Sequence, residues 1–298
     1  MLTMAFLKRL IRLCIRSQVI SCLSMAFWLT PLANLSAKTE SLDSLQQVLT
    51  QPEHADTLRV RVWQDMAYHY LHKDLNQAEA YLAKAKRLAD SVGFEKGQGK
   101  NLYLTGHLLI KQSKLDEAQS NFEQAQAIFE TVGHAVDIPK CYNGMGMVSY
   151  YKDNYQEAAA YFQKTAELYE GMGKGAEAVL AYNNIGLLYS DLGNMEQAKH
   201  YLNKAIAGFE KYNLIYSLSS GYNNLGTVYQ DQGNYPLAME SFNKAQDIFE
   251  ETGDLQGIAK IHNNMGVIFK RQGEYTKALE YYQKSMDYHE AKDDHRAV

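Results

Sequence analysis

A spacing of 40 residues recurs along most of the chain and limits its possible folds more than any other feature. Three series of residues mark this spacing independently of one another. They are Gly106, Gly146, Gly186, Gly226 and Gly266; Ala78, Ala118, Ala158, Ala198, Ala238 and Ala278; and Gly93, Gly133, Gly173, Asn213 and Gly253. Such self-similarity indicates structural units that stack on like neighbours and share a continuous core.

Within each unit, apolar residues are spaced as on one face of a helix, and this happens twice. The first set in one unit is Tyr182, Ile185, Gly186 and Tyr189, and the second is Ala198, Leu202, Ala205 and Phe209. The spacing i, i+3, i+4, i+7 predicts a helix for each set. Because glycine or alanine stands at the centre of each stripe, we expect two antiparallel helices that approach closely.

The third series predicts where the second helix of each unit ends. A helix commonly ends at a residue in the left-handed conformation, which is usually glycine. Asn213 is the one exception in the series, and asparagine also adopts that conformation readily. The turn inside each unit carries Gly193, Gly233 or Gly273, and earlier units have Ser113 and Asp153 there.

The repeated unit resembles the tetratricopeptide repeat over about residues 56–298. The residues that carry the resemblance are Tyr222, Leu225, Gly226, Tyr229, Ala238 and Phe242. The period is 40 rather than 34, and the usual closing proline is missing. Long-helix units of this kind resemble those of kinesin light chains and of bacterial sensor proteins with extracytoplasmic repeats. The resemblance implies an all-α fold, an α-α superhelix of the TPR-like solenoid type, whose concave wall is lined by the first helices.

The domain organisation follows from the repeat. Residues 1–37 are expected to be a signal peptide or membrane anchor, and 38–55 a short helix. Six hairpins are predicted at about 56–94, 95–134, 135–174, 175–214, 215–254 and 255–293, with the start of a seventh. Because the last residues align with the beginning of another first helix, we expect a longer natural protein that continues beyond Val298.

The N-terminal leader has the composition of an export signal. Its positive charges are Lys8, Arg9, Arg12 and Arg16, an apolar stretch covers 19–35, and a small-residue site follows near Ala37. This pattern predicts a cleaved secretory signal peptide, with an uncleaved anchor as the alternative. The body is therefore expected to be periplasmic or secreted, or anchored facing the periplasm, and to meet a membrane only through this segment.

Charge and cysteine content exclude some classes of function. The whole chain has 30 basic and 34 acidic residues, a net charge of −4. Four of the basic residues and none of the acidic ones lie in the leader, so the body carries a net charge of about −8. An acidic body lacks the electrostatic footprint of a nucleic-acid-binding protein. Outside the leader Cys141 is the single cysteine, so no internal disulfide can form, and its place on a helical stripe predicts a small packed residue.

Asparagines that recur on the first helices are the main candidate site. They are Asn143, Asn183, Asn184, Asn223, Asn224, Asn263 and Asn264. Similar asparagine ladders line the peptide grooves of kinesin light chains and O-GlcNAc transferase, so the resemblance implies a groove for an extended peptide. The alternative is a structural role as caps or bridges between helices. Asp191, Asp231 and Arg271 extend the candidate face, where a solvated mixed surface is the competing interpretation.

Patterns typical of catalysis are weak. The segment from Gly93 to Asn101 faintly resembles a phosphate-binding loop, but its spacing is wrong and no strand precedes it. Asp65, His69 and His72 could share a helix face, although exposed histidines are commoner than metal ligands. We therefore expect a non-enzymatic protein without cofactor or metal, a scaffold that binds a protein or an extended peptide segment. The alternative is the sensor region of a longer bacterial signalling protein, such as a histidine kinase with these repeats.

Overall fold

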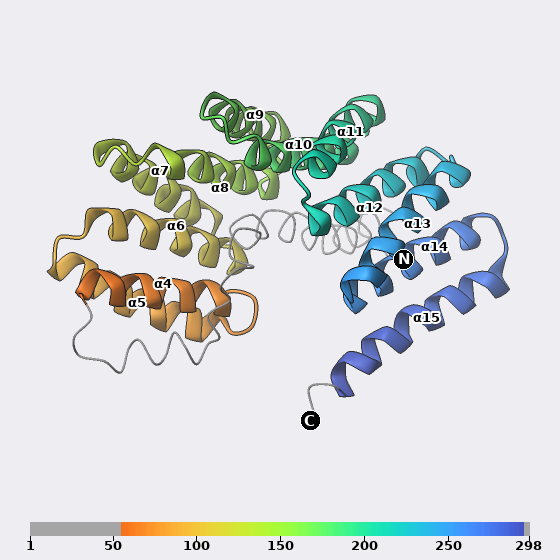
Figure 1. The fold of residues 1–298 in the computed structure, drawn as a ribbon, viewed down its shortest axis with the longest axis horizontal. Coiled ribbons are helices and arrows are strands. Elements are labelled where there is room, and N and C mark those ends of the chain that lie inside the picture. Colours follow the sequence, from red (N-terminus) through yellow and green to blue (C-terminus); the bar gives the residue numbers. More distant parts are fainter. Residues whose placement is uncertain (1–54, 295–298) are drawn as a thin grey trace, which may run out of the picture. The chain divides into compact units, whose positions relative to one another are not determined.

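The computed structural model describes residues 55–294, and Figure 1 shows their helices. The predicted leader and the predicted short helix before Ala55 lie outside these residues, as does the chain after Asp294. The described part contains twelve α-helices and one short 3₁₀-helix and no strand, so the predicted all-α class is confirmed. Among these residues no helix combines the length and the apolar character needed to cross a membrane.

The helices form two compact units, each of three hairpins. In the N-terminal unit, described from 55 to 173, the helices are α4 (Asp56–Tyr70), α5 (Leu75–Ser91), α6 (Glu95–Lys111), α7 (Leu115–Thr131), η1 (Ala135–Asp137), α8 (Ile138–Tyr151) and α9 (Tyr155–Gly171). In the C-terminal unit, described from 174 to 294, they are α10 (Gly175–Asp191), α11 (Met195–Lys211), α12 (Ile215–Asp231), α13 (Tyr235–Thr252), α14 (Leu255–Arg271) and α15 (Tyr275–Asp294).

The turns adopt the left-handed backbone that the sequence predicts. All glycines of the third series have positive φ, and Asn213 adopts φ 54° in the same place. Ser113 and Asp153, which replace glycine inside earlier hairpins, have φ 60° and 65°. After α10, the Gly193 and Asn194 amides donate to the carbonyls of Ser190 and Tyr189, at 2.9 Å each. This pattern is the Schellman motif, which satisfies carbonyls at the helix end.

Close helix contact explains the glycine series on the first helices. A Cβ added to Gly106 would lie 2.7 Å from the Phe122 ring, and one added to Gly226 would lie 2.6 Å from the Phe242 ring. Gly146, Gly186 and Gly266 meet Phe162, Leu202 and Tyr282 in the same way. Because real Cβ contacts are not this short, only glycine lets the two helices of a hairpin pack at this distance.

The N-terminal unit packs its first helices, α4, α6 and α8, in succession. Its largest fully buried side chains include Phe122 and Phe129. Cys141 lies beside Phe129 and is fully buried, which confirms that it is a packed residue. Burial, the largest cause, raises the pKa of the Cys141 thiol to about 12, so the thiolate does not form near neutral pH.

The C-terminal unit repeats this arrangement with α10, α12 and α14. Its core includes Phe242, Phe249 and Met265. The last helix is held to α14 by a hydrogen bond of 2.7 Å from the Ser285 hydroxyl to the Ala259 carbonyl. The first helices thus lie against one another, which brings residues one period apart into contact.

Candidate functional site

The asparagines of the C-terminal unit form a row across α10, α12 and α14. We define the asparagine row as Asn183, Asn184, Asn223, Asn224, Asn263 and Asn264. The four on α10 and α12 are buried, with Asn183 completely inaccessible, and the two on α14 are half-buried. A buried amide must find hydrogen-bond partners, because desolvating it without them costs free energy.

The row is linked from hairpin to hairpin by hydrogen bonds between amides. The Asn224 Nδ2 group donates to Asn183 Oδ1 at 3.1 Å, and the Asn264 Nδ2 group donates to Asn223 Oδ1 at 2.9 Å. In both cases the second asparagine of one hairpin binds the first asparagine of the hairpin before it. The bridging that the sequence left as an alternative is therefore present in the structure.

Each of these bonds uses the N–H group of one amide and the oxygen of the other, and leaves the second polar group of both amides for another partner. The Asn183 Nδ2 group is buried and has no hydrogen-bond partner within the described residues. The Oδ1 atom of Asn224, which donates to Asn183 in the bridge through its Nδ2 group, accepts no hydrogen bond within the described residues. A donor and an acceptor therefore remain on adjacent amides. They match the carbonyl and N–H groups that every peptide backbone carries, whatever its side chains.

The charged residues of the predicted face lie at the ends of the first helices. Arg271 donates to the Gln230 carbonyl at 2.9 Å and to the Asp231 carboxylate at 3.1 Å, so it joins α14 to α12. Asp191 is exposed at the end of α10. Gln230 was not among the predicted site residues, yet its side chain is buried and its Oε1 has no partner in the described part. Its position one period before Lys270, at the end of the same face, is the signal that could have added it.

Asn143 belongs to the N-terminal unit and has a different setting. It is fully buried on α8, and the next residue is Gly144 where the C-terminal unit has asparagine. A Cβ on Gly144 would lie 2.5 Å from the Phe122 ring. The amide pairs of the C-terminal unit are thus not reproduced at this position, because the second residue packs on an aromatic ring.

The residues considered for a metal have other partners. Asp65 forms an ion pair with Lys100 at 2.8 Å, and His69 lies 2.9 Å from the Lys73 amine. Within residues 55–294 no group of three or more histidine, cysteine or acidic side chains is arranged to hold a metal ion. The asparagine row is built from neutral amides, so its chemistry is hydrogen bonding.

A profile of the tetratricopeptide repeat family matches residues 137–211 and 217–291, which together make up about half of the chain. The chain belongs to the tetratricopeptide repeat family. These repeats indicate a protein-binding scaffold, and the two matched stretches include the whole asparagine row. No curated protein sequence matches this tetratricopeptide repeat protein well enough to count as a relative.

Solved structures share its fold at low sequence identity. BtubC (BKLC) from P. vanneervenii is 18% identical, with a TM-score of 0.62 over 75% of this chain and 92% of that one. A Rap protein complexed with Competence and Sporulation Factor is 18% identical, with a TM-score of 0.68 over 91% of this chain and 76% of that one. The tetratricopeptide repeat sensor protein PH0952 of Pyrococcus horikoshii, a signal transduction ATPase, is 16% identical, with a TM-score of 0.65 over 89% and 42%. These likenesses show the fold alone.

Proposed function

We propose that this protein is an extracytoplasmic, non-catalytic scaffold whose asparagine row binds the backbone of an extended protein segment. The observation that carries the proposal is that the bridges leave amide groups unused toward the more accessible end of the row, where Asn263 and Asn264 are half-buried. A peptide N–H on Asn224 Oδ1 and a peptide carbonyl on the Asn263 Nδ2 group would use two of them, while the completely buried Asn183 supports the row from within. Each hydrogen bond formed in this way would contribute about 1 kcal/mol to binding.

Because it would recognise the peptide backbone, the row would bind peptides of many different sequences. Each amide reads only a carbonyl or an N–H group, and these recur along any extended chain. The buried Oε1 of Gln230 offers a further acceptor near the end of α12. Specificity would then come from the charged ends of the helices, where Asp191, Asp231 and Arg271 lie.

Two further parts of the proposal rest on sequence. Export rests on the basic and apolar leader before Ala37. A role as the sensor region of a longer bacterial signalling protein is the alternative, and the repeat domain of the Pyrococcus horikoshii sensor protein supports it by fold. In both cases the bound segment would belong to another protein.

A peptide-selection experiment tests the groove. Peptides selected from a random displayed library on the purified chain would be synthesised, and their dissociation constants measured for the wild type and for Asn223→Ala/Asn263→Ala. Removing both amides is expected to weaken binding at least tenfold, because each lost hydrogen bond to a buried group contributes about 1 kcal/mol. N-methylation of the central peptide bonds should weaken binding to the wild type as well.

The matched control is Asn203→Ala/Asn243→Ala. Both of these asparagines are exposed on second helices, so the change in composition is the same but lies away from the row. Circular dichroism and thermal unfolding would verify that all variants are folded. Equal affinity of selected peptides for the wild type and the row variant would overturn the proposal.

A further inference from the structure

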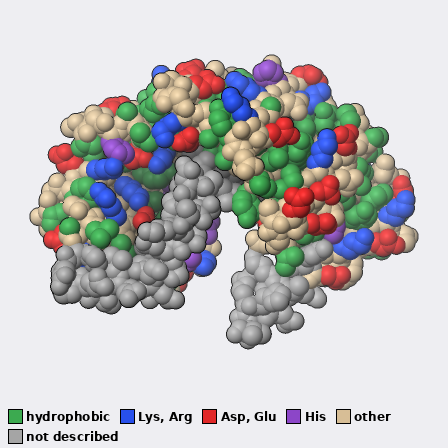
Figure 2. All heavy atoms as spheres, in the orientation of Figure 1, with side chains coloured by type: hydrophobic (Ala, Val, Ile, Leu, Met, Phe, Trp, Pro, Cys, Tyr) green, Lys and Arg blue, Asp and Glu red, His purple; other side chains and the backbone are tan. Residues whose placement is uncertain are grey.

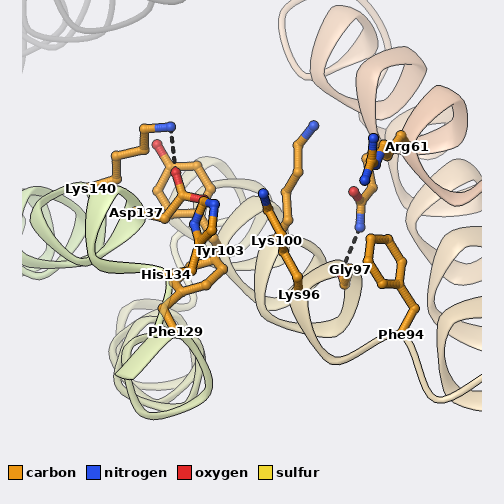
Figure 3. A pocket seen from close by; sticks show the side chains of 11 residues that line it. Arg61, Phe94, Lys96, Gly97, Lys100, Tyr103, Phe129, His134, Asp137 and Lys140 are labelled. Carbon is orange, nitrogen blue, oxygen red and sulfur yellow. Dashed lines mark hydrogen bonds and ion pairs between the residues drawn. The ribbon is translucent and has the colours of Figure 1, made fainter. Parts of the chain in front are cut away.

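The N-terminal unit contains a cavity of about 320 Å³ between α4, the beginning of α6 and the segment that joins α7 to α8. Figure 3 shows its side chains, with Arg61 on one side, Lys96 and Lys100 reaching out from α6, and Lys140 on the opposite side. Figure 2 shows a group of Lys and Arg side chains on the left of the view, over the area of α4 and α6. Four cations therefore line one small cavity in a protein whose overall charge is negative.

The cavity has more positive charge than its own acidic groups balance. Lys140 binds the Asp137 carboxylate at 2.6 Å, and Lys100 binds Asp65 at 2.8 Å. Within the described residues neither Arg61 nor Lys96 has a carboxylate partner, and Arg61 lies over the Phe94 ring at 5.6 Å. Two cations thus remain to meet an anion.

The remaining wall is apolar with one unsatisfied acceptor. Phe94, Tyr103 and Phe129 contribute rings to the lining. Gln64 is completely buried, and its Nε2 group donates to the Gly97 carbonyl at 2.7 Å. Its Oε1 atom is buried without a hydrogen-bond partner in this part of the chain. A ligand that fits all of these groups carries an anionic group, an apolar body and an N–H or O–H donor.

We propose that this cavity is a binding site for an organic anion, distinct from the asparagine row. Arg61 and Lys96 hold the carboxylate or phosphate group, Phe94 and Phe129 contact the apolar body, and Gln64 Oε1 accepts a hydrogen bond from the ligand. Charge-assisted hydrogen bonds of this kind are the strong ones in proteins. The same chemistry is available from a free small anion and from an acidic residue of a bound peptide.

The positions of the cations distinguish this site from the general repeat. Lys100 and Lys140 are one period apart, and the series continues with Leu180, Ser220 and Lys260. One period after Lys96 stands Val136. One period after Arg61 stands Asn101, so the two cations without a carboxylate partner, Arg61 and Lys96, are not part of the repeat pattern.

Hippurate is a suitable probe because it combines a phenyl ring, an amide N–H and a carboxylate. Its binding to the full chain would be measured by isothermal titration calorimetry, beside neutral hippuramide and inorganic phosphate. A blocked peptide with one glutamate beside a phenylalanine, and the same peptide with glutamine, would test the second source. We expect hippurate to bind more tightly than hippuramide, with an affinity that falls as salt is added.

The variants Arg61→Gln and Lys96→Gln should each weaken hippurate binding about tenfold, and the double variant should abolish it. Both side chains are exposed, so these changes should leave the fold intact. The control Lys114→Gln/Lys164→Gln removes the same charge from exposed positions of the same unit that do not line the cavity.

The outcomes separate the two sources and the two sites. Loss of hippurate binding in the cavity variants alone supports a free organic anion as ligand. Binding of the glutamate peptide but not hippurate, with the same loss, supports the site and assigns it to a peptide. No binding of any anion, or equal weakening by the control, overturns the site. Because Asn183 and Asn223 lie outside this cavity, its failure leaves the proposed peptide groove untouched.

Discussion

The two units use one hairpin geometry but carry different polar groups on it. Where the C-terminal unit has Asn184, Asn224 and Asn264, the N-terminal unit has Gly144, which packs on a ring. Where the N-terminal unit has Lys96, the C-terminal unit has Tyr216 and Gln256 in the same series. The comparison teaches that first-helix positions that face a buried side chain, such as Gly144 against Phe122, are fixed by close packing, while other first-helix positions can acquire binding groups.

The largest effects should come from the shared core, where the two units are expected to respond alike. Phe122→Ala and Phe242→Ala should each lower the free energy of unfolding by about 3–5 kcal/mol, because both rings are fully buried. The Phe122 variant should be the more severe, since Gly106 and Gly144 both border the ring and cannot fill the cavity. Urea unfolding followed by circular dichroism measures this.

The half-buried Phe269 provides the control for that pair, and its replacement by alanine should cost less. If the Phe122 and Phe269 variants were equally stable, the shared core would not dominate the stability of either unit.

The next prediction transfers a residue from one unit into the other. Gly144→Asn should destabilise the protein by about 1–3 kcal/mol, because its Cβ would press on the Phe122 ring. Gly171→Asn is the control, since nothing lies within 4 Å of a Cβ at that position and its φ is not positive. Thermal unfolding of both variants would compare them, and a harmless Gly144→Asn would remove the packing reason for the difference between units.

Acid should act more strongly on the N-terminal unit. The pKa of His107 is lowered to about 3 and that of His72 to about 4. In both cases burial is the largest cause and the nearby charge of Lys111 comes second. Burial also lowers the pKa of His262 in the C-terminal unit. Between about pH 6.5 and pH 3 the unfolded chain therefore binds more protons at these histidines than the folded chain does. The stability that the neutral histidines contribute is complete above about pH 6.5 and is lost as the pH falls toward about 3.

His107→Leu removes this titration and should flatten the dependence of unfolding free energy on pH. The wild type is expected to lose about 1–2 kcal/mol more than the variant between pH 7.5 and pH 5. Urea titrations at several pH values would show it, and parallel curves for the two proteins would contradict it.

The smallest expected effect concerns the amide bridges that only the C-terminal unit displays. A double-mutant cycle of Asn183→Ala and Asn224→Ala should give a coupling of about 0.5–1.5 kcal/mol, the net contribution of one hydrogen bond. Asn203→Ala combined with Asn243→Ala should show none, because these side chains are exposed on different second helices. A zero coupling for the first pair would mean that the bridge does not stabilise the unit.

Local patterns made much of the fold predictable. The glycine series forecast the close contact of Gly226 with Phe242, and one asparagine among glycines forecast the left-handed backbone at Asn213. Both features depend on neighbours within one hairpin, and their geometry follows from helix period and turn chemistry. The all-α class follows from the same signals.

Contacts between hairpins were harder to predict. Sequence placed the asparagines on one face but could not show that Asn224 binds Asn183, since that depends on the offset between successive first helices. Arg61, Lys96 and Lys140 come from three segments and meet only in the folded unit. The period shared by Lys100 and Lys140 was the one available signal.

The Schellman turns have a consequence for how such a chain can grow. Asn213 and Gly253 each close the helix before them with hydrogen bonds that need only that helix and the next residue. Duplicating residues 214–253 would join Gly253 to Leu214 and recreate the same closure at the new junction. A gene could thus gain or exchange a 40-residue cassette, and with it one more pair of asparagines, without redesigning the neighbouring hairpins.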